Sequence, residues 1–498
     1  MLVALTASVV VGAGLLPGPS PASAVNCHKS KTCSPSPSTT TTTPSTTSTT
    51  STTSTTSTTT TTAPPTSSAW YVSKSAPAGG DGKSWATAWN ELNAINWSVV
   101  QSGATVFLDG GTTSCGSNYQ FATTRPGVSC GMMYTTTLTP SRSGVTIRRS
   151  TDAGHNGTVV LYGGRPTPLP YCHQSSYSAG GTGAPALVSI GSVSSITLDG
   201  VTRSGIMGYG AQQGIVFSST SAANATIRNV ELFDNGYPTS ISGGYNSDGN
   251  NVVLRGAGHV FDRVLVHDGG QDDFHSASDD GGSNITWKNS WVYFNRENPL
   301  YPGSSYNEPQ STGCTHADLI QFYSGGTHSG LTLDHTVFGP GGNQGLYPSD
   351  GTLGTKYNNV TLTNSLFVAT ASHNIISDLA IHGWNVDHIT LYAPQGGSEM
   401  PSDGSMAFTN SIKYGGYWYA PGGTWNVGGT IWYGGDPIPG ASSVNPAFVG
   451  PLPTRSPPRF SEVLAADFTP TCSVCGGKGS PLHKVNDILS RIDALNAA

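Results

Sequence analysis

One short phrase recurs between about Thr197 and Lys413, and it constrains the fold more than any other feature of the chain. The phrase alternates apolar and polar residues, reaches a pivot residue, and continues into a second apolar run. Its eight copies place the pivots at Gly200, Asn229, Arg263, Asn289, His335, Asn364, His388 and Asn410. The pivots lie 22 to 46 residues apart, and self-similarity at such a period indicates stacked structural units.

The alternating flanks indicate that each unit is built from strands. A helical solenoid would show a 3.6-residue period, which is not visible here. A propeller blade needs about 40 residues and four strands, which is longer than most of the observed steps. We therefore predict a β-solenoid with roughly 22–30 residues per coil, in which each coil lies about 4.8 Å from the next.

The pivot positions are predicted to be tight bends. Four of the eight pivots are Asn, a residue that tolerates left-handed backbone geometry and bonds its own backbone. His335 and His388 occupy the same slot. We therefore interpret both histidines as turn residues rather than catalysts.

The chain is predicted to begin with segments that contribute nothing to a folded core. Residues 1–24 are typical of a secretory signal peptide, with an apolar run and an Ala-Ser-Ala cleavage signal, although no Lys or Arg precedes the run. Residues 25–33 form a short segment with two cysteines, and residues 34–68 are a Thr/Ser/Pro-rich linker expected to be disordered. The β-solenoid is predicted over 69–480. We expect an extracellular, secreted protein, with cell-wall association as an alternative.

Both ends of the solenoid are predicted to carry capping helices, because terminal repeats need a cover. Ser84 fits a helix N-cap before WATAWNELNAINW, in which the apolar residues fall on one face. At the other end, residues 481–498 contain an amphipathic pattern of Val485, Ile488, Leu489, Ile492 and Leu495. Each helix is expected to cover the terminal coil nearest to it.

The cysteines and the charge narrow the class of protein. Eight cysteines behind a signal peptide imply disulfides. The plausible pairs are Cys27–Cys33, Cys115–Cys130, Cys472–Cys475 and Cys172–Cys314. The formal charge of −6 is spread out without a basic stripe, which argues against nucleic acid as a partner. We expect a monomer without a membrane span.

The densest group of ionisable residues lies in 267–350. Short strands follow the pivots at 272–276, 318–322, 344–348 and 373–377. Aligning their inward apolar residues, Phe274, Ile320, Leu346 and Ile375, creates two further columns. One column contains Asp272, Asp318, Gln344 and His373. The other contains His275, Gln321, Tyr347 and Ile376. Asp272 and Asp318 are neighbours only if the 46-residue step is a single coil.

Two carboxylates at one strand spacing repel each other, so either one keeps its proton or a cation lies between them. The first case suits an inverting glycosidase, whose acid and base lie about 6.5–9.5 Å apart. The second suits a polysaccharide lyase with calcium at Asp272 and Asp318. The candidate catalytic residues are Asp272, Asp273, His275, Arg296, Glu297, His316 and Asp318. Arg296 is suited to a uronate carboxylate.

Substrate contacts are predicted from the polar and aromatic residues on the same coils, since sugar rings stack on aromatic faces. The candidates are Gln321, Tyr323, Tyr347 and His373. Weaker candidates near the same face are His267, Asp268, Asp350 and Asp378. The alternative interpretation is structural, because Asp residues in Gly-rich loops often cap turns.

The SWATAWNELNAINW stretch, the Asn pivots and the HADLIQFYSGG phrase resemble those of secreted bacterial right-handed parallel β-helix proteins of the pectate lyase-like superfamily. The resemblance implies an all-β, right-handed parallel β-helix over roughly 70–480. It implies no single reaction, because one fold hosts many functions. Asp272-Asp273 matches the Asp-Asp motif of polygalacturonases, but no Gly-His-Gly or Arg-Ile-Lys follows. Arg296-Glu297-Asn298-Pro299 only echoes the Arg-rich phrase of pectate lyases.

Three functions therefore compete at this stage. The first is a lyase that cleaves an acidic polysaccharide by β-elimination, and the second is an inverting glycoside hydrolase on the same fold. The third is a non-catalytic surface protein that binds glycan or cell wall. Calcium is the one cofactor expected, and a purely structural calcium at Asp272 and Asp318 is a further alternative.

Overall fold

The computed structural model describes residues 68–116, 130–164, 184–235, 250–269, 272–276, 282–294, 318–322, 326–341, 344–349, 356–368, 373–377, 382–394, 397–399, 404–419, 424–435, 438–454, 458 and 460–498. They belong to one compact unit, residues 64–498. The predicted signal peptide, the short cysteine segment and almost all of the predicted linker lie outside the described residues.

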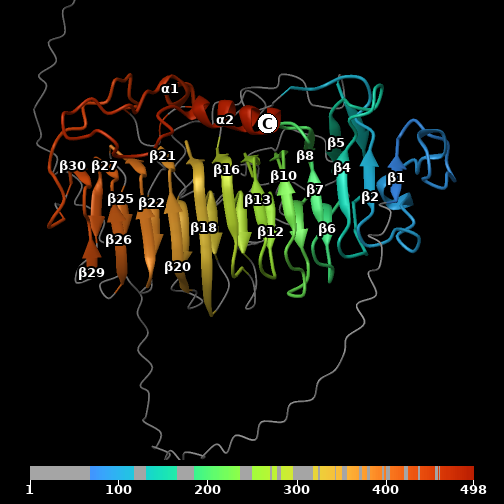
Figure 1. The fold of residues 1–498 in the computed structure, drawn as a ribbon, viewed down its shortest axis with the longest axis horizontal. Helices are drawn as coiled ribbons and strands as arrows, with labels where there is room; N and C mark the ends of the chain where they lie inside the picture. The colour runs from blue at the N-terminus through green and yellow to red at the C-terminus, as the bar shows by residue number, and fades with distance from the viewer. Residues whose placement is uncertain are drawn as a thin grey trace, which may run out of the picture. The chain divides into compact units, whose positions relative to one another are not determined.

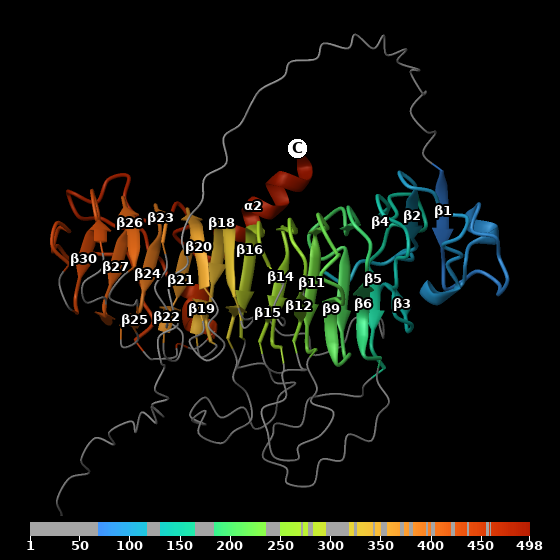
Figure 2. The same cartoon turned by 90° about the horizontal axis from the view of Figure 1, so that it is seen from below.

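The described residues form a parallel β-helix with three stacks of strands (Figures 1 and 2). The first stack contains β1 (Ala69–Val72), β2 (Thr105–Leu108), β4 (Thr146–Arg149), β7 (Thr197–Asp199), β10 (Thr226–Arg228), β13 (Val260–Asp262), β16 (Thr286–Tyr293), β18 (Thr327–Phe338), β20 (Lys356–Thr363), β23 (Trp384–Asp387), β26 (Ser405–Thr409) and β29 (Thr424–Asn426). All described strand pairings in it are parallel.

The second and third stacks complete each coil. The second contains β3 (Met132–Tyr134), β5 (Val159–Tyr162), β8 (Ile206–Tyr209), β11 (Val230–Phe233), β14 (Leu265–His267), β21 (Leu366–Val368), β24 (Thr390–Tyr392), β27 (Ile412–Tyr414), β30 (Ile431–Tyr433) and the last residues of β16 and β18. The third contains β6 (Ala186–Ile190), β9 (Gln213–Phe217), β12 (Val252–Leu254), β15 (Phe274–Ser276), β17 (Ile320–Phe322), β19 (Gln344–Ser349), β22 (His373–Ser377), β25 (Gly397–Glu399) and β28 (Tyr417–Tyr419).

The predicted pivots are the bends between the first and second stacks. Backbone φ is positive at seven of them, with values between 46° and 58°, namely Asn229, Arg263, Asn289, His335, Asn364, His388 and Asn410. This is the left-handed region, so the turn interpretation of His335 and His388 is confirmed. Gly200 is the exception, because the left-handed residue in that coil is Val201, with φ of 70°.

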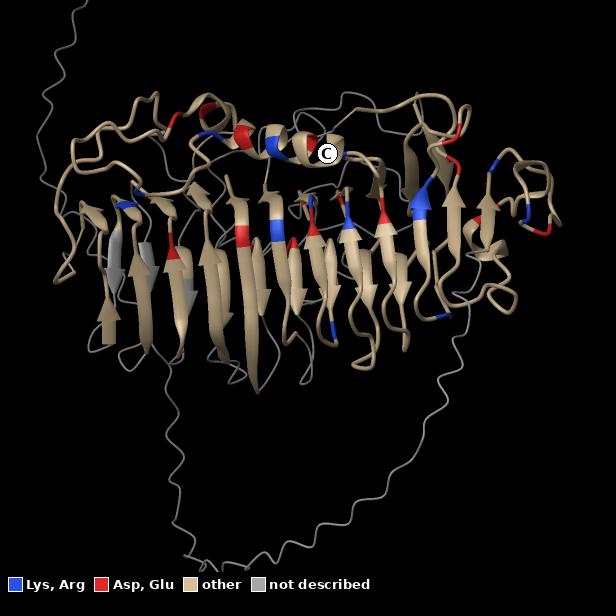
Figure 3. Ribbon diagram, in the orientation of Figure 1, with Lys and Arg blue, Asp and Glu red and all other residues tan. Residues whose placement is uncertain are grey.

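A carboxylate before every second pivot links two neighbouring coils. Asn289 donates its side-chain N–H to Asp262 at 2.8 Å, Asn364 donates to Asp334 at 2.8 Å, and Asn410 donates to Asp387 at 2.9 Å. Asn229 repeats the contact with Asp199 at 3.3 Å. These hydrogen bonds therefore join the coils two by two along the row of pivots. Figure 3 shows charged residues of the large sheet gathered along these strand ends, near α2 (Val485–Ala497).

The interior of the coils is apolar and fully packed. The aligned residues Phe274, Ile320, Leu346 and Ile375 are each at most 1% exposed and belong to one continuous core. Trp287, Phe261 and Leu333 extend the same core into the first stack. The inward positions predicted from the alternation are therefore confirmed.

The predicted N-terminal helix is wrong. Ser84 does act as a cap, accepting the Thr87 N–H at 3.3 Å, but the helix stops after one 3₁₀ turn, η1 (Trp85–Thr87). A second short turn, η2 (Leu92–Ala94), follows. Between them Trp89 pairs with β1, donating its backbone N–H to Tyr71 and accepting that of Ser73. This strand-like pairing breaks the helix.

The C-terminal helix forms over the predicted residues, but it packs at a different part of the solenoid from the one predicted. Val485, Ile488, Leu489 and Ile492 of α2 are buried, whereas Leu495 is 39% exposed. The helix packs on β16 and β18, in the middle of the solenoid, instead of on the last coil (Figure 1). The reason is an apolar outer face of the second stack, where a buried cluster joins α2, α1 (Phe460–Ala465) and the strands through Trp291, Val337, Leu366, Val463 and Ile488.

Two of the predicted disulfides are present. Cys115 is bonded to Cys130, and Cys472 to Cys475. The predicted pairs Cys27–Cys33 and Cys172–Cys314 lie outside the described residues.

Candidate functional site

The predicted register of the third stack is confirmed. Phe274 pairs with Ile320 and His275 with Gln321, and β19 continues the row with Leu346 and Tyr347. Because β15 pairs directly with β17, the 46-residue step is one coil. His275, Gln321 and Tyr347 alternate with core residues, so they lie on the outward side of the sheet. We call these three residues the outer row.

His275 is held by a carboxylate that precedes it on the same coil. Its Nδ1 lies 2.8 Å from Oδ2 of Asp272. Asp272 is 0% exposed and His275 is 2% exposed. A carboxylate on one ring nitrogen fixes the tautomer and the orientation of an imidazole. The Asp272–His275 contact thus joins the side chains of two predicted catalytic residues.

The same carboxylate is part of a ladder along the solenoid. Asn250 Oδ1 accepts the backbone N–H of Asp272 at 2.9 Å, and Asp272 Oδ1 accepts that of Asp318 at 3.0 Å. Asp318 Oδ1 then accepts the N–H of Gln344 at 3.0 Å. The predicted neighbours Asp272 and Asp318 therefore do lie on adjacent coils, where each supports the backbone of the next coil.

These contacts do not suit calcium. Ca²⁺ takes six to eight oxygen ligands at about 2.3–2.6 Å, whereas both oxygens of Asp272 already face nitrogen donors of His275 and Asp318. In the described part of the chain, no three His, Cys, Asp or Glu side chains are grouped to hold a metal.

A second ladder runs beside the first. Asn235 donates to Asn251 at 2.9 Å, and Asn251 donates to Oδ1 of Asp273 at 2.8 Å. Oδ1 of Asp273 also accepts the N–H of Gly269, while Oδ2 has no hydrogen-bond partner among the described residues. Burial, and secondarily the nearby charge of Asp268, raise the pKa of Asp273. Asp273 is thus a buried carboxyl that favours its neutral form.

A charged cluster lies next to this ladder. His267 Nδ1 is 2.8 Å from Asp268, and Nε2 is 3.1 Å from Glu231. Its ring is stacked between Phe233 and Tyr293, with centroids 5.2 and 4.6 Å away. Burial lowers the pKa of His267, but the two carboxylates outweigh it and raise the value to about 9. The weaker candidates His267 and Asp268 therefore form a buried ion cluster, which we call the His267 cluster.

Several predicted site residues cannot be placed. Arg296, Glu297, His316, Tyr323, Asp350 and Asp378 lie outside the described residues. His373 pairs with Gln344 at the start of β22, as the predicted column requires. Gln321 lies beside His275 and Tyr347 lies one coil further along, and they are 5% and 7% exposed.

The two ladders were not predicted, although the sequence carries a signal for them. Asn250-Asn251 precedes a core residue of β12, and Asp272-Asp273 precedes the equivalent residue of β15. Two amides at the positions of two carboxylates indicate that the slot is needed for hydrogen bonding along the stack. Catalysis alone would not require amides in the preceding coil.

No protein-family model matches the chain. No curated protein matches its sequence. Among solved structures, the chain is similar to XylC in complex with xylose, at 9% identity and a TM-score of 0.48, covering 76% of this chain and 87% of that one. It is also similar to a rhamnogalacturonan lyase, at 11% identity and a TM-score of 0.36, covering 85% and 98%.

A further similar structure is the pectate lyase Pel9A, at 14% identity and a TM-score of 0.34, covering 77% of this chain and 82% of that one. At these identities the likeness concerns the fold alone. None of the helices in the described residues has the length and apolar character needed to cross a membrane.

Proposed function

We propose that this protein cleaves an acidic polysaccharide by β-elimination, with His275 as the base and Asp272 as the residue that positions it. The observation that carries the proposal is the 2.8 Å contact between Asp272 Oδ2 and His275 Nδ1, in register with Gln321 and Tyr347. A positioned His contributes about 10²–10⁴-fold as a general base.

The reaction needs one base and one proton donor. His275 would take the proton from the carbon next to the uronate carboxylate, through Nε2, because Nδ1 faces Asp272. A carbon–carbon double bond then forms as the neighbouring glycosidic C–O bond breaks, and the leaving oxygen receives the proton that His275 has taken up, or one from a water molecule. Gln321 and Tyr347 would bind the sugar chain on one side of His275, since they occupy the two successive coils that follow it in the same row.

The hydrolase is less well supported. An inverting enzyme needs two carboxyl groups facing one substrate at about 6.5–9.5 Å. Asp272 and Asp318 instead turn one oxygen each toward the backbone of the next coil. This use of the carboxylates favours a mechanism with a single imidazole base.

Catalysis at His275 requires that the substrate reach the outer row. The three residues of the outer row are at most 7% exposed, so the substrate can reach them only if this face of the sheet opens. A reagent that modifies accessible imidazoles, applied with and without polysaccharide, would report such opening at His275.

The test is a screen of the protein against uronate and neutral polysaccharides, following both ultraviolet absorbance and reducing ends. Unsaturated ends from uronate chains, lost at least about 100-fold in His275→Ala, would support the proposal. The matched control is His388→Asn, which removes another histidine paired with an Asp. Full activity in His275→Ala, or equal loss in both variants, would reject the assignment.

A second candidate is a non-catalytic glycan-binding protein. The burial of the outer row favours it, together with the structural role of Asp272 and Asp318. Polysaccharide binding without new reducing or unsaturated ends after long incubation would support this second function over the first.

A further inference from the structure

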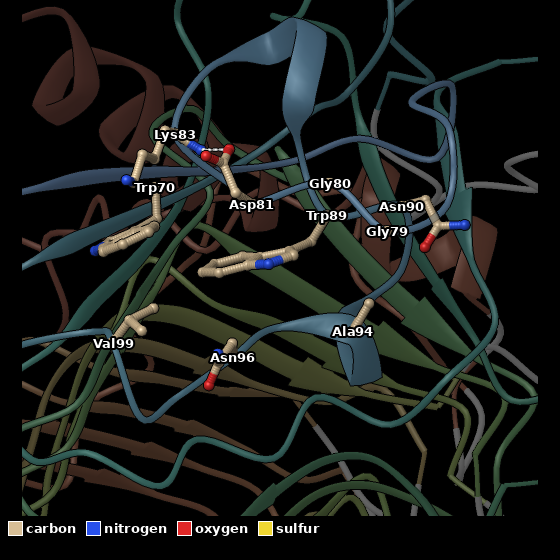
Figure 4. A pocket seen from close by; sticks show the side chains of 10 residues that line it. All are labelled: Trp70, Gly79, Gly80, Asp81, Lys83, Trp89, Asn90, Ala94, Asn96 and Val99. Carbon is tan, nitrogen blue, oxygen red and sulfur yellow. Dashed lines mark hydrogen bonds between the residues drawn. The ribbon is translucent and has the colours of Figure 1, made fainter.

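A pocket at the N-terminal end of the solenoid lies away from the outer row. It has a volume of about 390 Å³ and is lined by residues of β1, the loop after it, the segment between the two 3₁₀ turns, and η2 with the residues that follow it (Figure 4). Pockets of about 300–1,000 Å³ are typical of small-molecule sites. Its lining includes Trp70, Trp89, Asp81, Lys83, Asn90 and Asn96.

Two indole rings form one side of this pocket. Trp70 and Trp89 are nearly parallel, with an interplanar angle of 13° and centroids 5.2 Å apart. Figure 4 shows Ala94 and Asn96 on the opposite side. The two rings are fixed by their surroundings, because Trp89 pairs with β1 through its backbone and Gly82 leaves room for its ring. A Cβ on Gly82 would lie 2.7 Å from that ring.

The polar groups around the rings have unused hydrogen-bonding capacity. Trp70 is 8% exposed, yet its Nε1 has no hydrogen-bond partner among the described residues. The side-chain amide of Asn90 likewise makes no hydrogen bond within the described part of the chain. The Trp70 Nε1 is itself buried, so the partly exposed amide of Asn90 is the group that a ligand can reach.

Charge at the pocket rim is balanced. Asp81 is satisfied within its own loop, where it accepts from the Lys83 backbone N–H at 3.0 Å and from the Thr87 hydroxyl at 2.6 Å. Lys83 supplies one positive charge beside it. The ligand that fits indole faces, amides and a balanced rim is uncharged, with an apolar face and hydroxyl groups at its edge.

We infer that this pocket binds a neutral pyranose unit of a polysaccharide, separately from the outer row. The C–H face of the sugar would lie on the indoles, and its hydroxyls would bond to the Asn90 and Asn96 amides. The inference does not depend on catalysis at His275. It gives the protein a second contact with a glycan chain, at one end of the solenoid.

The test is titration calorimetry of the full chain with neutral hexasaccharides of xylose, glucose and mannose, and with a galacturonate hexasaccharide. Ala94→Leu fills the pocket from an exposed turn without removing a core residue. We expect it to weaken binding of a neutral oligosaccharide at least about tenfold, equivalent to 1.4 kcal/mol. Asn93→Leu places the same leucine side chain on the same turn outside the lining and should stay within about twofold.

The background variant His275→Ala separates this inference from the proposed reaction, since it should bind like the unaltered protein even if all cleavage is lost. The inference is overturned if no neutral sugar binds, or if Ala94→Leu binds as tightly as Asn93→Leu. Tighter binding of the galacturonate, lost in Ala94→Leu, would also overturn it by showing that the site selects charge.

Discussion

The outer row and the row of pivots both contain a histidine bonded to an aspartate, and the contacts are nearly identical. The Nδ1–Oδ2 distance is 2.8 Å for His275 and Asp272, 2.8 Å for His335 and Asp334, and 2.6 Å for His388 and Asp387. The surroundings differ. The His275 side chain is 2% exposed, whereas that of His388 is 39% exposed.

The difference shows that an Asp–His contact does not by itself indicate chemistry. At the pivots the aspartate also binds an Asn of the next coil, and the histidine occupies a left-handed slot that Asn fills elsewhere. The turn geometry therefore accounts for both the aspartate and the histidine at the pivots. His275 lies in a regular strand instead of a left-handed bend, and there its imidazole is held by the buried carboxylate of Asp272.

The largest expected difference between the two rows is in stability. Asp272→Ala removes a fully buried acceptor and leaves His275 and the Asp318 N–H without it, which should cost about 3–5 kcal/mol of unfolding free energy. Asp387→Ala removes a partly exposed acceptor and should cost about 1 kcal/mol. Denaturant unfolding of both variants measures the contrast.

Asp272→Asn refines this result, because Asn250 already fills the equivalent slot of the preceding coil. It should fold with little loss, yet orient His275 poorly and lower any cleavage activity. Equal costs for the two alanine variants would refute the distinction between the rows.

The next contrast is in pH dependence. Burial opposes ionisation of Asp334, but hydrogen bonds from His335, Asn364 and Thr363 outweigh it and lower its pKa. A lowered carboxyl pKa gives stability that is present above about pH 4 and lost in acid. The pKa of His267 is raised to about 9, so its contribution is complete below about pH 6.5 and disappears as pH rises through 9.

The pivots should therefore weaken in acid, and the His267 cluster in alkali by up to about 3 kcal/mol. Melting temperatures across pH 3–10 would show both limbs. The variant Asp273→Asn tests the carboxyl next to the His267 cluster. It keeps the acceptor for Asn251 but removes a buried carboxyl whose pKa is raised. It should be more stable than the unaltered chain at neutral pH. A flat alkaline limb would contradict the charge assigned to His267.

The smallest effect is expected at the pivots themselves. His388→Asn places the commonest pivot residue in its own slot, so the unfolding free energy should change by less than about 0.5 kcal/mol. His388→Val puts a β-branched residue at φ of 52° and should cost more, about 1–3 kcal/mol. If the two variants are equally stable, the left-handed bend does not select the residue.

The repeat, the bends and the register could be predicted from the sequence, because stacked strands repeat the same physical demand in every coil. Phe274, Ile320 and Leu346 had to face inward, and that alone aligned Asp272 with Asp318. The helices could not be placed in the same way. Trp89 belongs to a local helical pattern, but its pairing with β1 is a tertiary contact that the pattern does not contain.

The roles of the site residues were harder to predict for a related reason. An acid and a ladder residue look alike in sequence, since both are polar groups at the same position of a coil. Only the partners of Asp272 and Asp273 separate the two roles, and those partners come from neighbouring coils. The tryptophan pocket was missed because its lining comes from turns and a strand that no repeat connects.

Helix α2 should also affect how this solenoid unfolds. Coils that touch only their neighbours can fray from either end, one at a time. Here Asp493 pairs with Arg203 at 3.0 Å, Arg491 donates to Asn289 at 2.6 Å, and Arg263 donates to the carbonyl of Leu495 at 3.2 Å. One helix thus fastens coils that are tens of residues apart. Because α2 follows every coil in the chain, this fastening can close only after all of them have been synthesised, and a chain cut short would hold its coils with less cooperativity.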